Sequence, residues 1–156
     1  LGEASNGSNA KVVGALLAAL TNDQDDLVRS NAAYAMGQIF RCKVSDFSAA
    51  IDALIHRLSP GIEPNNTEVA LFPRSTVRQS IAYSLLQAAS NHEFSSEQIE
   101  KLLALTLEDD DRYVQGFAIE VTRQNQNLSA RSVDALLAAL SRLRLSPSAP
   151  AVISES

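Results

Sequence analysis

The segment Gly14-Ala-Leu-Leu-Ala-Ala-Leu20 recurs near the other end of the chain as Asp134-Ala-Leu-Leu-Ala-Ala-Leu140, with only its first residue changed. Between these copies, the segments Ile51 to Leu58 and Ile99 to Leu103 share the spacing apolar-x-x-apolar-apolar. That spacing puts apolar side chains on one face of an α-helix. Because self-similarity along a chain is typical of repeat proteins, we predict that these four segments are the first helices, called A, of four successive repeats.

A second pattern alternates with the A helices. Val28-Arg29-x-x-Ala32-Ala33-Tyr34 is followed by Val77-Arg78-x-x-Ile81-Ala82-Tyr83 and then by Val114-Gln115-x-x-Ala118-Ile119-Glu120. The valines that open the three copies are 49 and 37 residues apart. The pattern predicts a second helix, called B, in three of the repeats, and a connection that varies in length.

The extra length lies at residues 59–73, where three prolines and one glycine forbid a continuous helix. We therefore predict a loop insertion in the second repeat. Elsewhere the links between A and B helices are short and acidic, as at 22–26 and 108–111, where Asp can cap the following helix. Ser95, with Gln98 three residues later, predicts a capping box.

These boundaries predict the domain organisation. Residues 1–8 are expected to be the end of a preceding repeat or a linker, so that more of the array lies upstream. The repeat array is expected to span 9–144, and the flexible, Ser/Pro-rich tail 145–156. Within the array we expect helix pairs at about 9–41, 45–90 and 95–125, and a last helix at 129–144.

The run Asp25-Asp-Leu-Val28-Arg29-Ser-Asn-Ala32-Ala33-Tyr-Ala-Met36-Gly37-Gln-Ile39 resembles a HEAT repeat of the phycobilisome-lyase-like type. The resemblance covers about residues 9–144, although the third copy has Gln115 in place of arginine and the insertion is atypical. It implies an all-α fold, a right-handed α-α superhelix (a HEAT-like solenoid) of about seven helices. It also implies that Arg29 and Arg78 belong to a structural ladder between repeats and are not anion-binding residues.

Composition supports this fold and limits the partners. The chain is 46% hydrophobic but only 5% aromatic, without Trp, which favours close-packed helices. Its 13 basic and 18 acidic residues give a net charge of -5, so nucleic acid is not an expected partner. The longest apolar stretch, Val12 to Leu20, is too short to cross a membrane. With a single cysteine, Cys42, the chain is expected in the reducing cytoplasm and not at a membrane.

Residues that could carry chemistry are few. His92-Glu93 is the only His-Glu pair, whereas the HEAT-like deoxyhypusine hydroxylases, which the architecture resembles, use several such pairs to hold two irons. His56 has no ligand-type partner four residues later, because that position is Pro60. The acidic runs lack the pattern of a calcium loop. We therefore expect no catalytic residues, no metal site, no cofactor and no enzymatic activity.

A polar and aromatic stripe on the B helices is the predicted binding site. If Val28, Ala32, Met36 and Ile39 face the core, helical spacing puts another set of side chains on a separate stripe. In the three B helices this set contains Asn31, Tyr34, Gln38 and Arg41, then Ser80, Tyr83 and Gln87, then Phe117, Glu120 and Gln124. Since B helices typically line the concave side of such solenoids, we expect a protein or peptide to bind there.

Other interpretations stay open. Tyr34 and Tyr83 can instead pack between adjacent repeats, with the glutamines as solvent-facing helix formers. The apolar residues 69–72 give the insertion a second candidate surface, and the first A helix is expected to expose Val13, Leu16, Leu17 and Leu20 partly, allowing self-association. The predicted function is a protein-interaction scaffold or sensor segment of a larger HEAT-repeat protein. The alternative is a phycobilisome-lyase-like factor acting in bilin attachment or detachment on an antenna protein.

Overall fold

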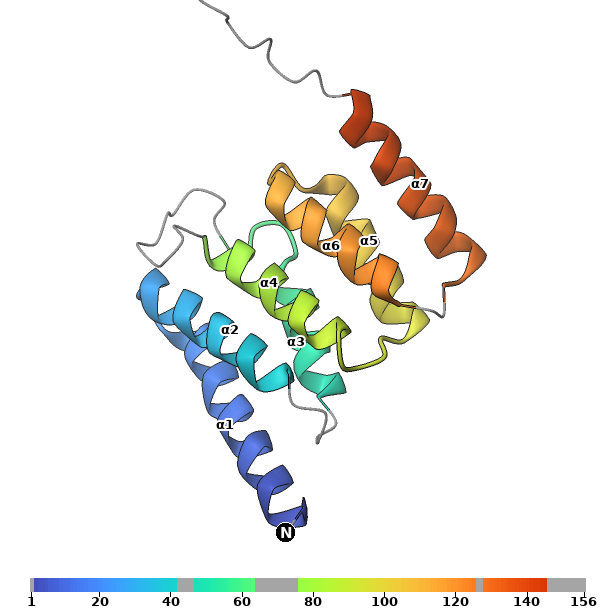
Figure 1. The fold of residues 1–156 in the computed structure, drawn as a ribbon. Coiled ribbons are helices and arrows are strands. Elements are labelled where there is room, and N and C mark those ends of the chain that lie inside the picture. The colour runs from blue at the N-terminus through green and yellow to red at the C-terminus, as the bar shows by residue number, and fades with distance from the viewer. Residues whose placement is uncertain (1, 42–46, 64–75, 126–127, 146–156) are drawn as a thin grey trace, which may run out of the picture.

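A computed structural model describes residues 2–41, 47–63, 76–125 and 128–145. The described residues form seven helices and no strand (Figure 1). The expected fold, an all-α HEAT-like solenoid of about seven helices, is confirmed. The helices are α1 (Gly2–Asn22), α2 (Asp26–Phe40), α3 (Ser48–Arg57), α4 (Val77–Ala89), α5 (Ser96–Glu108), α6 (Arg112–Gln124) and α7 (Ala130–Leu145).

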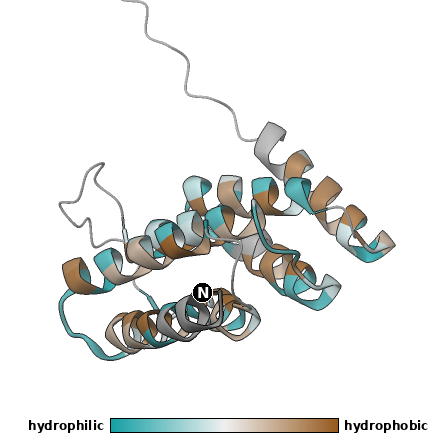
Figure 2. Ribbon diagram, turned by 60° about the horizontal axis from the view of Figure 1, so that its bottom comes forward, coloured by the Kyte–Doolittle hydropathy of each residue, from teal (hydrophilic) through white to brown (hydrophobic). Residues whose placement is uncertain are grey.

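The helices form two layers. The A helices α1, α3, α5 and α7 contact one another in succession, and so do the B helices α2, α4 and α6. Each of the first three A helices also packs on the B helix of its own repeat. Coloured by hydropathy, the helices carry both apolar and polar residues (Figure 2), as expected of amphipathic helices that bury one side between layers.

The N-terminal boundary differs from the prediction. Gly2 to Asn22 form one continuous helix, so residues 2–8 belong to α1 and are not a separate linker or the end of another helix. The segment has no proline, and a glycine weakens a helix by only about 1 kcal/mol. Of the predicted insertion at 59–73, residues 59–63 form a turn with Gly61 at a positive φ of 80°; residues 64–75 lie outside the described part, as do 146–156.

The B helices begin at capping residues, as their acidic links predict. Asp25 accepts a hydrogen bond from the Leu27 amide at 2.8 Å, and Asp111 accepts one from the Tyr113 amide at 2.8 Å. The predicted capping box in front of α5 is confirmed, since Ser95 and Gln98 exchange bonds of 2.9 and 3.2 Å. These caps satisfy amides that have no partner inside their own helix.

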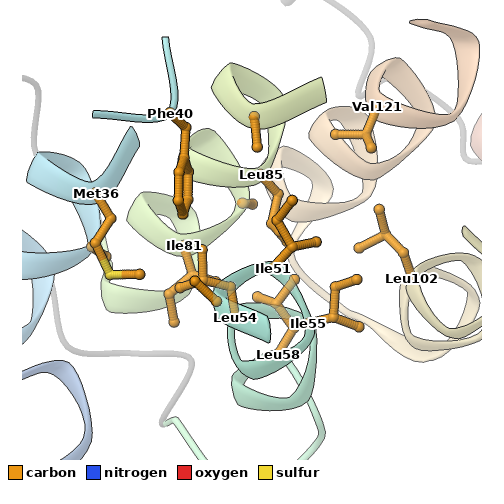
Figure 3. Close-up of a cluster of buried hydrophobic side chains, with 14 of the residues drawn as sticks. Met36, Phe40, Ile51, Leu54, Ile55, Leu58, Ile81, Leu85, Leu102 and Val121 are labelled. Carbon is orange, nitrogen blue, oxygen red and sulfur yellow. The ribbon is translucent and has the colours of Figure 1, made fainter. Parts of the chain in front are cut away.

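Apolar side chains from α2 to α6 meet in one core between the layers (Figure 3). They include Met36 and Phe40 from α2, and Ile81 and Leu85 from α4, none of them more than 1% exposed. Ile51, Leu54 and Ile55 of α3, and Leu58 at the C-cap of that helix, belong to the same core and are at most 2% exposed.

The predicted exposure of α1 is correct only in part. Leu16 and Leu17 are half-buried, as expected, but Val13 and Leu20 are buried in the core. Val28 of α2 was expected to face the core, but its side chain is 38% exposed.

Small residues let α2 and α4 approach closely. The Oγ atoms of Ser30 and Ser80 are 2.7 Å apart, and Ser84 Oγ donates to the Ala33 carbonyl of the other helix. A Cβ atom added at Gly37 would lie 3.0 Å from the Cα and the Oγ of Ser84. The two helices therefore pack almost backbone to backbone along this line.

A ladder of buried charges joins successive repeats. Arg29 of α2 lies 3.3 Å from Glu63, in the turn of the second repeat, and Glu63 also pairs with Arg57. Arg78 of α4 pairs with Asp109, in the turn of the third repeat, and the two side chains are only 4% and 1% exposed. The ladder that the resemblance implied for Arg29 and Arg78 is thus present. Burial, and then the positive charge of Arg29, lower the pKa of Arg57.

Gln115 takes the place of the ladder arginine in α6. Its side-chain amide donates to the Asp109 carbonyl, just as Arg29 donates to the Asp23 carbonyl at 3.0 Å. Gln115 therefore keeps the hydrogen bond within its own repeat. Unlike arginine, it has no charge that could pair with a carboxylate of a following repeat.

We expect Gly37→Ala to lower the free energy of unfolding by about 1 to 2 kcal/mol, because overpacking against Ser84 outweighs the better helix propensity of Ala. Gly14→Ala and Gly116→Ala are matched controls, since nothing lies within 4 Å of a Cβ at either position. Urea denaturation followed by circular dichroism measures all three. Equal effects at the three glycines would contradict the close contact.

We expect Asp109→Ala to destabilise the chain by about 3 to 5 kcal/mol, because it leaves the buried guanidinium of Arg78 without its counter-ion. The neighbouring exposed Asp110 provides the control, and Asp110→Ala should change stability by no more than about 0.5 kcal/mol. Thermal or urea unfolding distinguishes the two. Similar losses for both variants would mean that the acidic turn acts only through its overall charge.

Candidate partner-binding surface

Three aromatic rings form a continuous row across the B helices. The rings of Tyr34 in α2 and Tyr83 in α4 are stacked, with centroids 5.3 Å apart and planes at 11°. Phe117 in α6 meets Tyr83 edge to face, at 6.3 Å and 78°. Both are favoured arrangements for aromatic pairs. Tyr34 is 46% exposed and the other two rings are half-buried, so the row is open at the α2 end.

The row runs obliquely with respect to the repeat register. Tyr34 and Tyr83 occupy equivalent positions, but the equivalent residue in α6 is Glu120. Phe117 stands one helical turn earlier, at the position of Ser80 in α4. The contact between Tyr83 and Phe117 therefore depends on how α6 is placed against α4.

The recurring glutamines form a polar row beside the aromatic one. Gln38 Nε2 donates to the Tyr83 hydroxyl at 3.4 Å, which links α2 to α4. Ser90 Oγ donates to Gln124 Oε1 at 3.2 Å, which links α4 to α6. Gln87 holds the equivalent position in α4, the helix between α2 and α6, and is half-buried. Tyr34 and Tyr83 thus pack across repeats, as the second interpretation expected. Gln38 and Gln124, which that interpretation treated as solvent-facing helix formers, also bond across repeats while remaining partly accessible.

The remaining predicted residues differ in where they lie. Asn31 and Arg41 are exposed at the α2 end, and Arg41 Nη1 approaches Gln38 Oε1 at 3.5 Å. Ser80, by contrast, is only 4% exposed, because it lies in the close contact between α2 and α4. The sequence-based set is therefore corrected at this position: Ser80 is a packing residue and is left out of the surface.

Glu120 carries the best-defined electrostatic feature of the surface. Its carboxylate accepts hydrogen bonds from Arg123 Nε and Nη2 at 2.7 and 2.6 Å, and from Gln124 Nε2 at 3.0 Å. The hydrogen bonds from Arg123, then that from Gln124, lower the pKa of Glu120 to about 2. Arg123 is not among the residues predicted from the sequence, although its spacing of three residues from Glu120 is the signal for such a pair.

Tyr113, at the start of α6, is an exposed aromatic residue that was not predicted from the sequence and that has no ring contact with the aromatic row. It is 71% exposed, the largest value among the large hydrophobic side chains of the described residues. It stands immediately before Val114, the first residue of the repeated pattern, and the residues at the equivalent position before Val28 and Val77 are Leu27 and Thr76. Since these three residues share no chemical property, the internal repeat offered no signal for it.

A pocket of about 320 Å³ lies where α4 and α6 end. Its polar lining includes His92, whose Nε2 is 3.0 Å from the carbonyl of Phe40, the last residue of α2. The ring of His92 also meets Phe47 edge to face at 5.2 Å. His92 therefore caps the end of α2 and helps hold the turn after α4. The full lining is Ala89, Ser90, Asn91, His92, Glu93, Gln124 and Asn125.

The described residues contain no group of three or more His, Cys, Asp or Glu side chains that could hold a metal ion. Cys42 lies outside them. Within the same part of the chain, no helix is both long and apolar enough to cross a membrane.

The family comparison agrees with this geometry. Residues 12–42, which hold the second half of α1 and all of α2, match the family model of the HEAT repeat. The match supports a HEAT-repeat protein. It does not extend to the phycobilisome-lyase-like subtype. No curated protein and no solved structure matched the chain.

We expect the carboxyl group of Glu120 to titrate near pH 2 instead of near 4.5, and Arg123→Ala to return its pKa toward the ordinary value. Because the folded-state pKa is lowered, the stabilisation by this pair is present above about pH 4.5 and is lost as the pH falls toward 2. NMR titration of the side-chain carboxyl carbons measures both. A pKa near 4.5 in the unsubstituted chain would contradict the pairing.

Proposed function

We propose that the chain is a protein-interaction scaffold that holds a partner protein or peptide on the exposed side of its B helices. The observation that carries this proposal is the continuous row of Tyr34, Tyr83 and Phe117. HEAT repeats commonly serve as protein-interaction scaffolds, and the match at residues 12–42 supports that class. The B-helix surface consists of Asn31, Tyr34, Gln38, Arg41, Tyr83, Gln87, Phe117, Glu120 and Gln124.

The aromatic rings of this surface are already ordered before a partner binds. Tyrosine gives a large contact area with only two side-chain torsions, and stacking of Tyr34 on Tyr83 already restricts both rings before a partner arrives. Binding then costs less side-chain entropy than it would at isolated rings. The neighbouring Gln38 and Gln124 each offer both a donor and an acceptor. A segment with apolar side chains over the rings and polar groups over the glutamines fits this pattern.

The phycobilisome-lyase-like role stays the alternative, and no contact among the described residues favours it. It requires a bilin site, so mixing the chain with a free bilin should change the absorbance spectrum of the pigment. An unchanged spectrum would remove this alternative without affecting the scaffold proposal.

We expect the double variant Tyr34→Ala, Tyr83→Ala to lose partner capture from native cell extract. Aromatic hot-spot residues contribute about 2 kcal/mol or more each, which corresponds to roughly 30-fold in affinity. Tyr113→Ala is the control, because Tyr113 is exposed but makes no contact with the aromatic row in the described structure. If the double variant keeps its helical circular dichroism and still captures the partner as the control does, the B-helix surface is not the binding site.

A further inference from the structure

The first repeat has a face that its equivalents in the later repeats do not expose. Val28, Val77 and Val114 hold the same position in the three B helices. Val77 and Val114, whose repeats follow another, are each 2% exposed, whereas Val28 is 38% exposed. Each of the three repeats has its own A helix. The difference between them is therefore the preceding B helix, which packs on α4 and α6 but has no described counterpart at α2.

The acidic turn of the first repeat shows the same contrast. Asp109 uses Oδ1 to accept the Asp111 amide at 2.9 Å and Oδ2 to pair with Arg78 of the preceding repeat. Asp23, at the equivalent position, uses Oδ1 to accept the Asp25 amide at 2.9 Å. No donor from the described residues reaches its Oδ2.

Tyr34 completes this face. In α4 the equivalent ring, Tyr83, is covered by a tyrosine from the preceding repeat, at 5.3 Å. In α2 the ring of Tyr34 stacks only on the following repeat and is 46% exposed. We call Asp23, Val28 and Tyr34 the upstream face. It combines a carboxylate equivalent to Asp109, an aliphatic side chain equivalent to Val77 and Val114, and a ring equivalent to Tyr83, each of which meets the preceding repeat at its own position.

We propose that the upstream face docks a HEAT-type helix pair that supplies an arginine to Asp23 Oδ2. Within this chain, Arg78 on Asp109 shows what such a contact looks like, since the helix pair α3–α4 packs on the third repeat with that arginine in its B helix. The proposed partner stands in the same relation to the first repeat. Its B helix covers Val28 and the open side of Tyr34.

A second copy of this chain is the less suitable occupant. The last described B helix, α6, carries Gln115 where α2 and α4 carry the ladder arginine. An end-to-end stack of two copies would therefore place an uncharged amide opposite Asp23. The charge of Asp23 is complementary to a repeat with arginine at that position, and such a repeat is the occupant that the face selects.

To test this, a second copy of residues 47–95, with its own Arg78, is fused in front of residue 2 to give a fused chain. Val28→Cys in a Cys42→Ser background then reports whether the upstream face is covered. We expect thiol labelling of Val28→Cys to slow by roughly tenfold or more in the fused chain compared with the unfused one. Its rate should approach that of Val77→Cys, the buried equivalent. Changing Arg78→Gln in the added copy alone, or Asp23→Asn, should remove much of this protection.

Several results would overturn the proposal. One is labelling of Val28→Cys at the unfused rate while Val77→Cys stays protected. Another is a fused chain that gains no helical circular dichroism, since the same sequence folds where it already meets an equivalent face. Equal protection by the Arg78→Gln copy would contradict the need for arginine. Protection that rises with concentration in the unfused chain would identify a second copy as the occupant.

Discussion

The close contact between α2 and α4 determines which other side chains of the two helices meet. Gly37 lies against Ser84, and the hydroxyl groups of Ser30 and Ser80 meet inside the contact. Because no large side chain separates the two helices, their next stripes of residues also come together. This is why Tyr34 and Tyr83 stack at 5.3 Å. The aromatic row is thus a consequence of small residues on the adjacent stripe.

The ion pairs of the charge ladder also join successive repeats, near the N-terminal ends of the B helices. Buried ion pairs such as Arg78 with Asp109 add little net stability compared with apolar packing, but they penalise every arrangement that leaves a charge unpaired. They therefore favour one register between repeats. Packing along the helices and charge pairing at the turns together fix how each repeat sits on the next, and so fix the spacing of the B-helix surface.

Much of this architecture could be predicted from the sequence, because repeated patterns carry it. The helix pairs follow from apolar spacing, and the ladder positions follow from the recurrence of Val-Arg in α2 and α4. Other features depend on neighbours that a pattern does not contain. Ser80 shares a stripe with Tyr83 but is buried by α2, and Val28 shares a register with buried valines but no helix among the described residues covers it. The pairing of Tyr83 with Phe117 requires the relative placement of two helices, which a one-dimensional alignment does not give.

We propose that the exposed side of the B helices, and not that of the A helices, holds the partner. Site-specific photo-crosslinking tests this most directly, with a photoreactive amino acid at Asn31 on α2 or at His56 on α3, both exposed positions. We expect a discrete crosslinked partner from position 31 in native extract and none from position 56. A partner crosslinked from position 56, with none from position 31, would contradict it.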